Sequence, residues 1–188
     1  MPHFLISGIA ALGSDVMSAL MAEGSTAVRV DDIAGVAGVC AEAGPGAFAG
    51  YIQLPATFTV TGSTAVDRVH RFFGEGVLAR FPAVEAALPT LADGARITFV
   101  MGVLPPEVWT GDDVTARAAL VRVLGRAACA DGPPELSVSV LASGVSAREI
   151  ALTALGRNPE LELLAEGPDG GSYADWRVEL LGMISAEM

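Results

Sequence analysis

The stretch FLISGIAALGSDVMSALMAEG, residues 4–24, decides the fold. It opens with a short apolar run, passes through a glycine-containing turn, and continues with apolar residues at helical spacing. Val16 and Leu20 stand four residues apart and therefore share one face of a helix. The stretch predicts a strand over His3–Ser7 followed by a helix over about Ser14–Glu23.

The same alternation repeats along the chain. Five further short runs are rich in Val, Ile, Leu and Phe, which predicts strands at Ala27–Val30, Gly50–Leu54, Arg96–Met101, Leu136–Leu141 and Leu161–Leu164. Segments with helical spacing between them cover Val66–Leu91, Asp113–Cys129 and Ala147–Leu155. Because strand and helix alternate with short connections, we expect an α/β, Rossmann-like doubly wound parallel sheet in a single domain over residues 1–188.

Composition limits the classes of partner. The 188 residues are 52% hydrophobic and contain no apolar run long enough to cross a bilayer, so we expect one soluble domain with a sizeable core. The net charge of −11 argues against nucleic acid or an anionic membrane as a partner, because phosphate binding requires a cationic face. Residues 1–10 lack the basic region of a secretion signal, so we expect a cytoplasmic protein.

The residue inventory excludes several chemistries. All 11 basic residues are arginine, so no Schiff base, P-loop lysine or lysine-activated hydroxyl exists in this chain. Cys40 and Cys129 have no CxxC or metal-ligand neighbour and are predicted as reduced thiols. His3 and His70 are isolated, which predicts neither a metal site nor a Ser/His/Asp triad.

The expected ligand site follows from the sheet. In an open parallel sheet, ligands bind beyond the carboxyl ends of the strands, where the strand order reverses. That rim is predicted to comprise Gly8–Gly13, Leu54–Thr57, Gly102–Pro105 and Ala142–Val145. Its apolar composition would suit a small apolar ligand.

Four segments together resemble the short-chain dehydrogenase/reductases. Residues 4–24 look like the family's nucleotide-binding strand, turn and helix, and LPTLADGARITFVMG (88–102) looks like the approach to its catalytic strand. Residues 115–144 and LELLAEGPDGG (161–171) look like the helix and strands that follow. The stretch between Asp32 and Tyr51 is too short for the strand and helix that the family places there, so we expect a fold shortened by about one strand–helix unit.

The resemblance implies a catalytic serine, tyrosine and lysine, and this chain lacks them at the matching positions. Arg117 falls at the lysine, Asp113 at the tyrosine, and Gly102, or Met101 after a shift of one, at the serine. The family's helix asparagine falls near Phe72 or Phe73. Aspartate is an anion and arginine stays protonated at neutral pH, so we do not expect a dehydrogenase of the tyrosine–lysine type.

Asp113 and Arg117 are nevertheless the candidate catalytic pair. Their i, i+4 spacing brings them together on a helix, where Asp113 would act as general base and Arg117 as an oxyanion or carboxylate clamp. The alternative is an ordinary helix ion pair.

The cofactor turn of the family is also degenerate. Gly8 keeps the first glycine, Leu12 and Ser14 replace the next two, and Gly13 lies between them. Asp31 or Asp32 stands where the family's acidic residue binds an adenosine ribose, although such a pair is also ordinary turn chemistry. Gly8, Gly13 and Asp31 are thus the candidate cofactor residues. We expect that the protein binds no cofactor. If this turn is functional, the expected cofactor is NAD or NADP.

Two further signals lie outside this pattern. Tyr173 and Arg177 stand four residues apart, as the family's tyrosine and lysine do, but follow the last predicted strand, where a surface or interface role is expected instead. The loop PPEVWTGDD (105–113), which contains Trp109, suggests a lid, a partner contact or a helix cap at Asp112.

Three functions therefore remain open. The first is a non-redox structural or regulatory subunit, in a homo-oligomer or with a complete paralogue, which associates through its two long helices at Val69, Phe73, Val77, Ala118, Val121 and Gly125. The second is a repurposed cyclase, dehydratase or isomerase of an apolar intermediate, with Asp113 or Glu107 moving a proton. The third is an atypical oxidoreductase that uses NAD or NADP.

Overall fold

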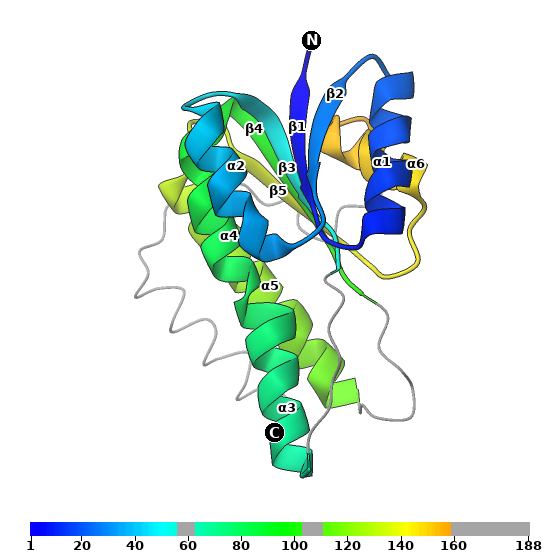
Figure 1. The fold of residues 1–188 in the computed structure, drawn as a ribbon, viewed down its shortest axis with the longest axis vertical. Helices are drawn as coiled ribbons and strands as arrows, with labels where there is room; N and C mark the ends of the chain where they lie inside the picture. The colour runs from blue at the N-terminus through cyan, green and yellow to red at the C-terminus, as the bar shows by residue number, and fades with distance from the viewer. Residues whose placement is uncertain (56–62, 103–110, 159–188) are drawn as a thin grey trace.

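A parallel five-stranded sheet forms the centre of the molecule (Figure 1). The computed structural model describes residues 1–55, 63–102 and 111–158, except the side chains of 111–115. The strands are β1 (His3–Ser7), β2 (Thr26–Val30), β3 (Phe48–Gln53), β4 (Leu91–Val100) and β5 (Ser137–Leu141). They lie in the order β2-β1-β3-β4-β5, and all four neighbouring pairs are parallel. The order reverses between β1 and β3, which confirms the predicted doubly wound architecture.

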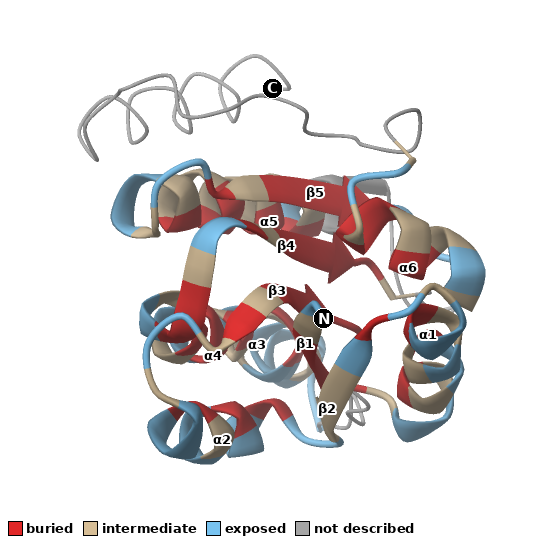
Figure 2. Ribbon diagram, turned by 90° about the horizontal axis from the view of Figure 1, so that it is seen from above, coloured by how far each residue is buried: buried red, intermediate tan, exposed pale blue. Residues whose placement is uncertain are grey.

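Helices cover both faces of this sheet (Figure 2). One face carries α1 (Ala10–Ala22) and α6 (Ala147–Ala154), which contact each other. The opposite face carries α2 (Val36–Ala43), α4 (Arg80–Ala87) and α5 (Gly111–Asp131). Helix α3 (Ala65–Phe73) extends past the carboxyl ends of the strands (Figure 1).

The predicted helix over Val66–Leu91 is helical but not continuous. A π-helical turn at Gly74–Leu78 separates α3 from α4, and a 3₁₀ turn at Leu88–Thr90 leads into β4. The π turn contains Gly74 and Gly76, whose low helix propensity favours an interruption there.

The predicted shortening is confirmed. A 3₁₀ turn (Ile33–Gly35) and α2 are the only elements between β2 and β3, so one crossover replaces the strand–helix unit that the family adds. Helix α2 itself is absent from the prediction, because its eight residues are too few to show a clear helical period.

Other boundaries also differ from the prediction. Helix α1 begins at Ala10, four residues before Ser14, because the chain turns at Gly8 and enters the helix at once. Strand β4 begins at Leu91, five residues before Arg96, and its register to β3 shifts over that part. The predicted strand Leu161–Leu164 lies outside the described residues.

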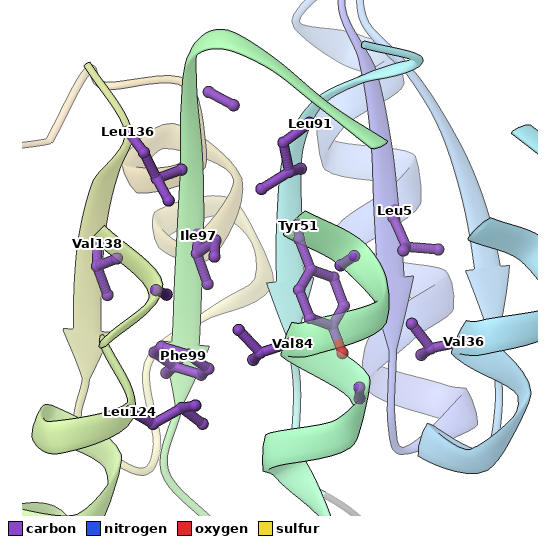
Figure 3. Close-up of a cluster of buried hydrophobic side chains, with 14 of the residues drawn as sticks. Leu5, Val36, Tyr51, Val84, Leu91, Ile97, Phe99, Leu124, Leu136 and Val138 are labelled. Atoms are coloured by element: carbon purple, nitrogen blue, oxygen red, sulfur yellow. The ribbon is translucent and has the colours of Figure 1, made fainter. Parts of the chain in front are cut away.

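Alternation along the strands divides the core into two clusters. Leu5 faces one cluster and its neighbours Phe4 and Ile6 face the other, as expected for successive residues of a strand. The larger cluster lies between the sheet and α2, α4 and α5 (Figure 3). Gly125 of α5 permits close packing there, because a Cβ would lie 2.9 Å from Val138 Cγ1.

Candidate functional site

The turns after β1, β3 and β4 converge at the carboxyl edge of the sheet. Gly8 has φ +116°, and a Cβ on it would lie 2.7 Å from the Leu54 carbonyl oxygen and 2.8 Å from that of Pro55. A Cβ on Gly102 would lie 3.1 Å from Pro55 Cβ. Two glycines therefore let the three chain segments meet, at the strand-order reversal where α/β proteins bind ligands.

A buried polar network lies just below this edge. The hydroxyls of Ser7 and Tyr51 are 2.8 Å apart, and Gln53 Nε2 donates to the Tyr51 oxygen at 3.0 Å. All three side chains are fully buried. Burial raises the pKa of Tyr51 to about 12, so the phenol stays protonated at neutral pH.

Arg80 extends the network. Its guanidinium donates to Gln53 Oε1 at 3.4 Å and to the Val100 carbonyl at 3.1 Å, and the residue is only 4% exposed. Burial lowers the pKa of Arg80 to about 10, which still leaves it a cation at neutral pH.

Arg117 lies at the same edge and is 9% exposed. Its Nη2 donates to the Gly102 carbonyl at 2.7 Å, and its guanidinium carbon is 5.8 Å from the centre of the Phe72 ring. Its Nε is buried without a hydrogen-bond partner. Burial lowers the pKa of Arg117, and the positive charge of Arg117 also disfavours the charged form of Arg80.

The structure thus brings together three of the positions matched to the family's catalytic groups. Gly102, at the serine position, and Phe72, near the asparagine position, both contact Arg117, at the lysine position. Asp113 lies in α5, one turn before Arg117, but its side chain is outside the described residues.

The two candidate phosphate-turn glycines have different surroundings. The amides of Gly8 and Ile9 donate within the chain, to the carbonyls of Val30 and Pro55. Gly13 lies in the first turns of α1 and faces Arg29, whose Cδ would be 2.9 Å from a Cβ at Gly13. Gly13 is thus a packing glycine of a helix, because α1 begins earlier than predicted.

Asp31 is linked to the first turn of α1 through Arg29. Arg29 Nε lies 2.9 Å from Asp31 Oδ1, and its Nη1 donates to the Ala10 carbonyl at 2.8 Å and to the Ser14 hydroxyl. The Asp31 carboxylate is therefore already paired. Asp32 accepts from the Ala34 amide at 3.1 Å, which is the turn role weighed for this pair.

The structure corrects two predictions about surfaces. Val77, Val121 and Gly125 are buried and so cannot form the proposed association face, because the inner sides of both helices pack on the sheet. Leu54, which belongs to the predicted apolar rim, is buried as well. The edge is also more polar than expected, since the sequence interpretation missed Tyr51, Gln53 and Arg80.

The available signal for the missed residues was a polar residue at the end of an otherwise apolar run. Gln53 is the polar residue in the stretch GYIQLP (50–55), and Arg80 stands between apolar residues in VLARFPAV (77–84).

Some of the remaining candidate residues lie within the described residues, and others lie outside them. Cys40 and Cys129 are free thiols whose pKa values burial raises, and His70 is exposed on α3. Within the described ranges, no group of three or more His, Cys, Asp or Glu side chains is arranged to hold a metal, and no helix is long and apolar enough to span a membrane. Glu107, Trp109, Asp112, Tyr173 and Arg177 have side chains outside the described residues.

Comparison with known proteins finds similar solved structures but no similar sequence family. No family model matches the sequence, and the search of curated proteins gives no match. Among solved structures, one described as a small-chain dehydrogenase has a TM-score of 0.64 at 17% identity, over 91% of this chain and 98% of that chain. The protein lin1944 from Listeria innocua has a TM-score of 0.62 at 13% identity, over 86% and 96%.

BdcA, a protein from E. coli, is a third such structure. Its complex with NADPH has a TM-score of 0.58 at 16% identity, over 85% of this chain and 88% of that chain. At these identities the likeness establishes the fold, which is that of the short-chain dehydrogenase/reductases, and leaves the activity to the site itself.

Proposed function

We propose that this protein, whose fold is that of the short-chain dehydrogenase/reductases, is a non-redox structural or regulatory subunit. The observation that carries the proposal is Arg117. It occupies the position of the family's lysine, and its guanidinium is bonded to the Gly102 carbonyl at a place where the family would have its serine. The fixed positive charge of an arginine would lower the pKa of a nearby tyrosine. The position that matches the family's tyrosine is Asp113, so Arg117 has no phenol there to activate.

The proton donor is the second missing part. Reduction of a carbonyl requires a group within hydrogen-bond reach that gives a proton to the substrate oxygen, and in the family this group is the tyrosine hydroxyl. Tyr51 is the one tyrosine among the described residues, and it is fully buried in the sheet with its pKa raised to about 12. It therefore serves packing and the internal network.

The turn after β1 supports the same proposal. Two of its amides are used by neighbouring strands, and Arg29 covers the buried side of Gly13. The Asp31 carboxylate, the candidate ribose ligand, is already paired with Arg29.

Calorimetric titration with NADPH and NADH tests this proposal. We expect no saturable heat with either cofactor up to about 1 mM. Saturable binding of NADPH at micromolar concentration would contradict the view that the cofactor turn has lost its function.

A second candidate is dinucleotide binding without hydride transfer. Arg29 favours it, since it lies beside the first turn of α1, and an arginine in this region of the fold accommodates the 2′-phosphate of NADP. BdcA, which shares the fold, has been crystallised with NADPH. In this case NADPH would bind more tightly than NADH, and Arg29→Gln would remove that preference.

The partner surface is part of the proposal. With Val77, Val121 and Gly125 buried, the exposed apolar residues of this region are Val66 and Val69 on α3 and Leu78 just after it. We assign the contact with a second copy, or with a complete paralogue, to this outer side of α3, because α3 extends beyond the sheet and leaves these side chains uncovered by described residues.

A further inference from the structure

We propose that Arg80 and Arg117 bind an anionic oxygen group of a small ligand at the carboxyl edge of β3 and β4. This group is either a carboxylate or a phosphoryl group. This inference goes beyond the proposed function, because it concerns a ligand of a different class from the nicotinamide cofactors and does not depend on what the cofactor turn does.

The first argument is burial without a counter-charge. Arg80 is 4% exposed and Arg117 is 9% exposed. Within the described part of the chain, neither guanidinium has an Asp or Glu carboxylate at ion-pair distance. They donate instead to the Gln53 amide oxygen and to the carbonyls of Val100 and Gly102. Buried charges in proteins are normally paired, because an unpaired one loses its hydration without compensation.

The second argument is the mutual repulsion of the two cations. The charge of Arg117 disfavours protonation of Arg80, so the pair is close enough to interact unfavourably. An anion between or beside them would remove this repulsion and supply the missing counter-charge. The net charge of the chain is −11, so an overall excess of positive charge does not explain why two arginines lie close together.

The third argument is unused donor capacity. A guanidinium has five N–H donors in a planar fork, which suits carboxylate and phosphate oxygens. Arg117 makes a single hydrogen bond among described residues, and its buried Nε has none. The guanidinium carbon lies over the Phe72 ring, 5.8 Å from its centre, a cation–π contact that uses no N–H donor.

The fourth argument is position. Arg117 is beside Gly102, Gly102 packs on Pro55, and Pro55 lies against Gly8, so the pair belongs to the edge where the strand order reverses. Open α/β sheets bind their ligands at this edge. Gly102 lies directly beside Arg117, since a Cβ on it would be 3.9 Å from Nη1.

Binding of inorganic phosphate and of succinate, each titrated alone by calorimetry and by thermal unfolding, tests the inference. In the wild-type protein we expect saturable heat and a Tm that rises by about 3–6 °C at a tenfold excess over Kd for at least one probe. Saturation by phosphate identifies a phosphoryl ligand, and saturation by succinate identifies a carboxylate. Saturation by neither overturns the inference.

Arg117→Gln is the main variant, with Arg148→Gln as its control. Arg148 is an exposed arginine on α6, so its substitution removes the same charge from another face. We expect Arg117→Gln to weaken binding about 10–100-fold and Arg148→Gln to leave it unchanged. Phosphate also stabilises proteins by exclusion from their surface, so an equal Tm rise in all three proteins would overturn the inference.

The stability of the ligand-free variants separates binding from a structural role. If Arg117 is kept for an anion, Arg117→Gln removes an uncompensated buried charge, and its ligand-free Tm is expected to equal or exceed that of the wild type. A lower Tm together with unchanged anion binding would show a purely structural arginine. Arg117→Lys keeps the charge without the fork and should bind with intermediate affinity.

Failure here and failure of the proposed function are distinguishable. The anion probes contain no nicotinamide, so a negative result with them leaves the non-redox proposal intact. Binding of NADPH that persists in Arg117→Gln would contradict the view that the cofactor turn has lost its function and leave the anion site untouched.

Discussion

At the scale of single residues, the account depends on hydrogen bonds that sequence patterns do not show. Tyr51 accepts from Gln53 and pairs with Ser7, and all three are fully buried in adjacent strands. We expect Tyr51→Phe to lower the free energy of unfolding at pH 7 by about 1–3 kcal/mol, because it leaves Ser7 and Gln53 short of a partner. Urea unfolding followed by circular dichroism measures this loss.

The same variant has a distinct alkaline signature. With the pKa of Tyr51 raised from 10.0 to about 12, the phenol ionises in the unfolded chain before it does in the folded one. Its contribution is therefore present below pH 10 and is lost as pH rises from 10 through 12. The stability difference between wild type and Tyr51→Phe should shrink in this window; a constant difference would contradict the assigned environment. The pKa of Arg80 is lowered to about 10, so its effect on stability changes with pH in the opposite sense. Both wild type and Tyr51→Phe contain Arg80, so the difference between these two proteins isolates the effect of Tyr51.

Gly8 is the residue on which the edge geometry rests. Gly8→Ala would place a Cβ 2.7 Å from a backbone oxygen at φ +116°, and we expect it to cost about 2–4 kcal/mol in unfolding free energy. Gly24→Ala is the matched control, since Gly24 also has a positive φ, +79°, but nothing lies within 4 Å of its Cβ position. The control should cost only about 1 kcal/mol. Equal losses in the two variants would show that the contact with Leu54 and Pro55 is unimportant.

At the scale of elements, helix α6 is stabilised by a complete capping box. The Ser146 hydroxyl accepts from the Glu149 amide, and the Glu149 carboxylate accepts from the Ser146 amide at 2.9 Å. Ser146→Ala should lower the free energy of unfolding by about 1 kcal/mol near neutral pH. Ser143→Ala, in the exposed turn before the helix, is the control and should have no effect.

This effect has a predictable pH dependence. Bonds from Ser146 hold the pKa of Glu149 below its ordinary value of 4.5. A lowered carboxyl pKa stabilises the folded state above the unfolded value and loses that stabilisation as pH falls through the folded value. The difference between wild type and Ser146→Ala is therefore expected to decrease below pH 4.5. An increase on acidification would be incompatible with the capping box.

Helix α3 carries the element-scale prediction about association. Val66→Asp combined with Val69→Asp places two charges on the outer side of α3, where these residues are 77% and 42% exposed. We expect the wild type to be at least a dimer by light scattering and this variant to be a monomer with unchanged circular dichroism. Met21→Asp, at another exposed apolar residue, on α1, should leave the oligomer intact. A variant that stays dimeric would remove α3 from the interface.

The elements were largely predictable, and the exceptions have physical causes. Strands such as β1 and β5 are short apolar runs between turn residues, so local pattern defines them. Helix α2 is too short to show a period, and the break at Gly74–Leu78 is marked only by Gly74 and Gly76, which lower helix propensity without requiring a break.

The site was predictable only in part. Correspondence with the family's catalytic positions led to Arg117, and the structure places it with Gly102 and Phe72. Arg80 was missed because a charged residue among apolar ones, as in VLARFPAV, does not reveal from sequence alone whether it is buried or exposed. Its importance appears only when β3 and β4 bring Gln53 and the Val100 carbonyl beside it.

At the scale of the whole molecule, the fold and the chemistry separate. The sheet order and the helices on both faces are those of the short-chain dehydrogenase/reductase fold, shortened by one unit. The described side chains at that edge include two buried arginines and a buried phenol, in a chain without lysine. A fold can keep its geometry after the groups that carried its reaction are replaced.

The most direct test of this account is a single-turnover measurement of NADPH oxidation at 340 nm, with the purified protein in molar excess over NADPH and a panel of aldehydes and ketones present. The account predicts that absorbance decays at the rate of the protein-free control for every carbonyl compound. A protein-dependent loss of absorbance that saturates with any one of them would contradict it.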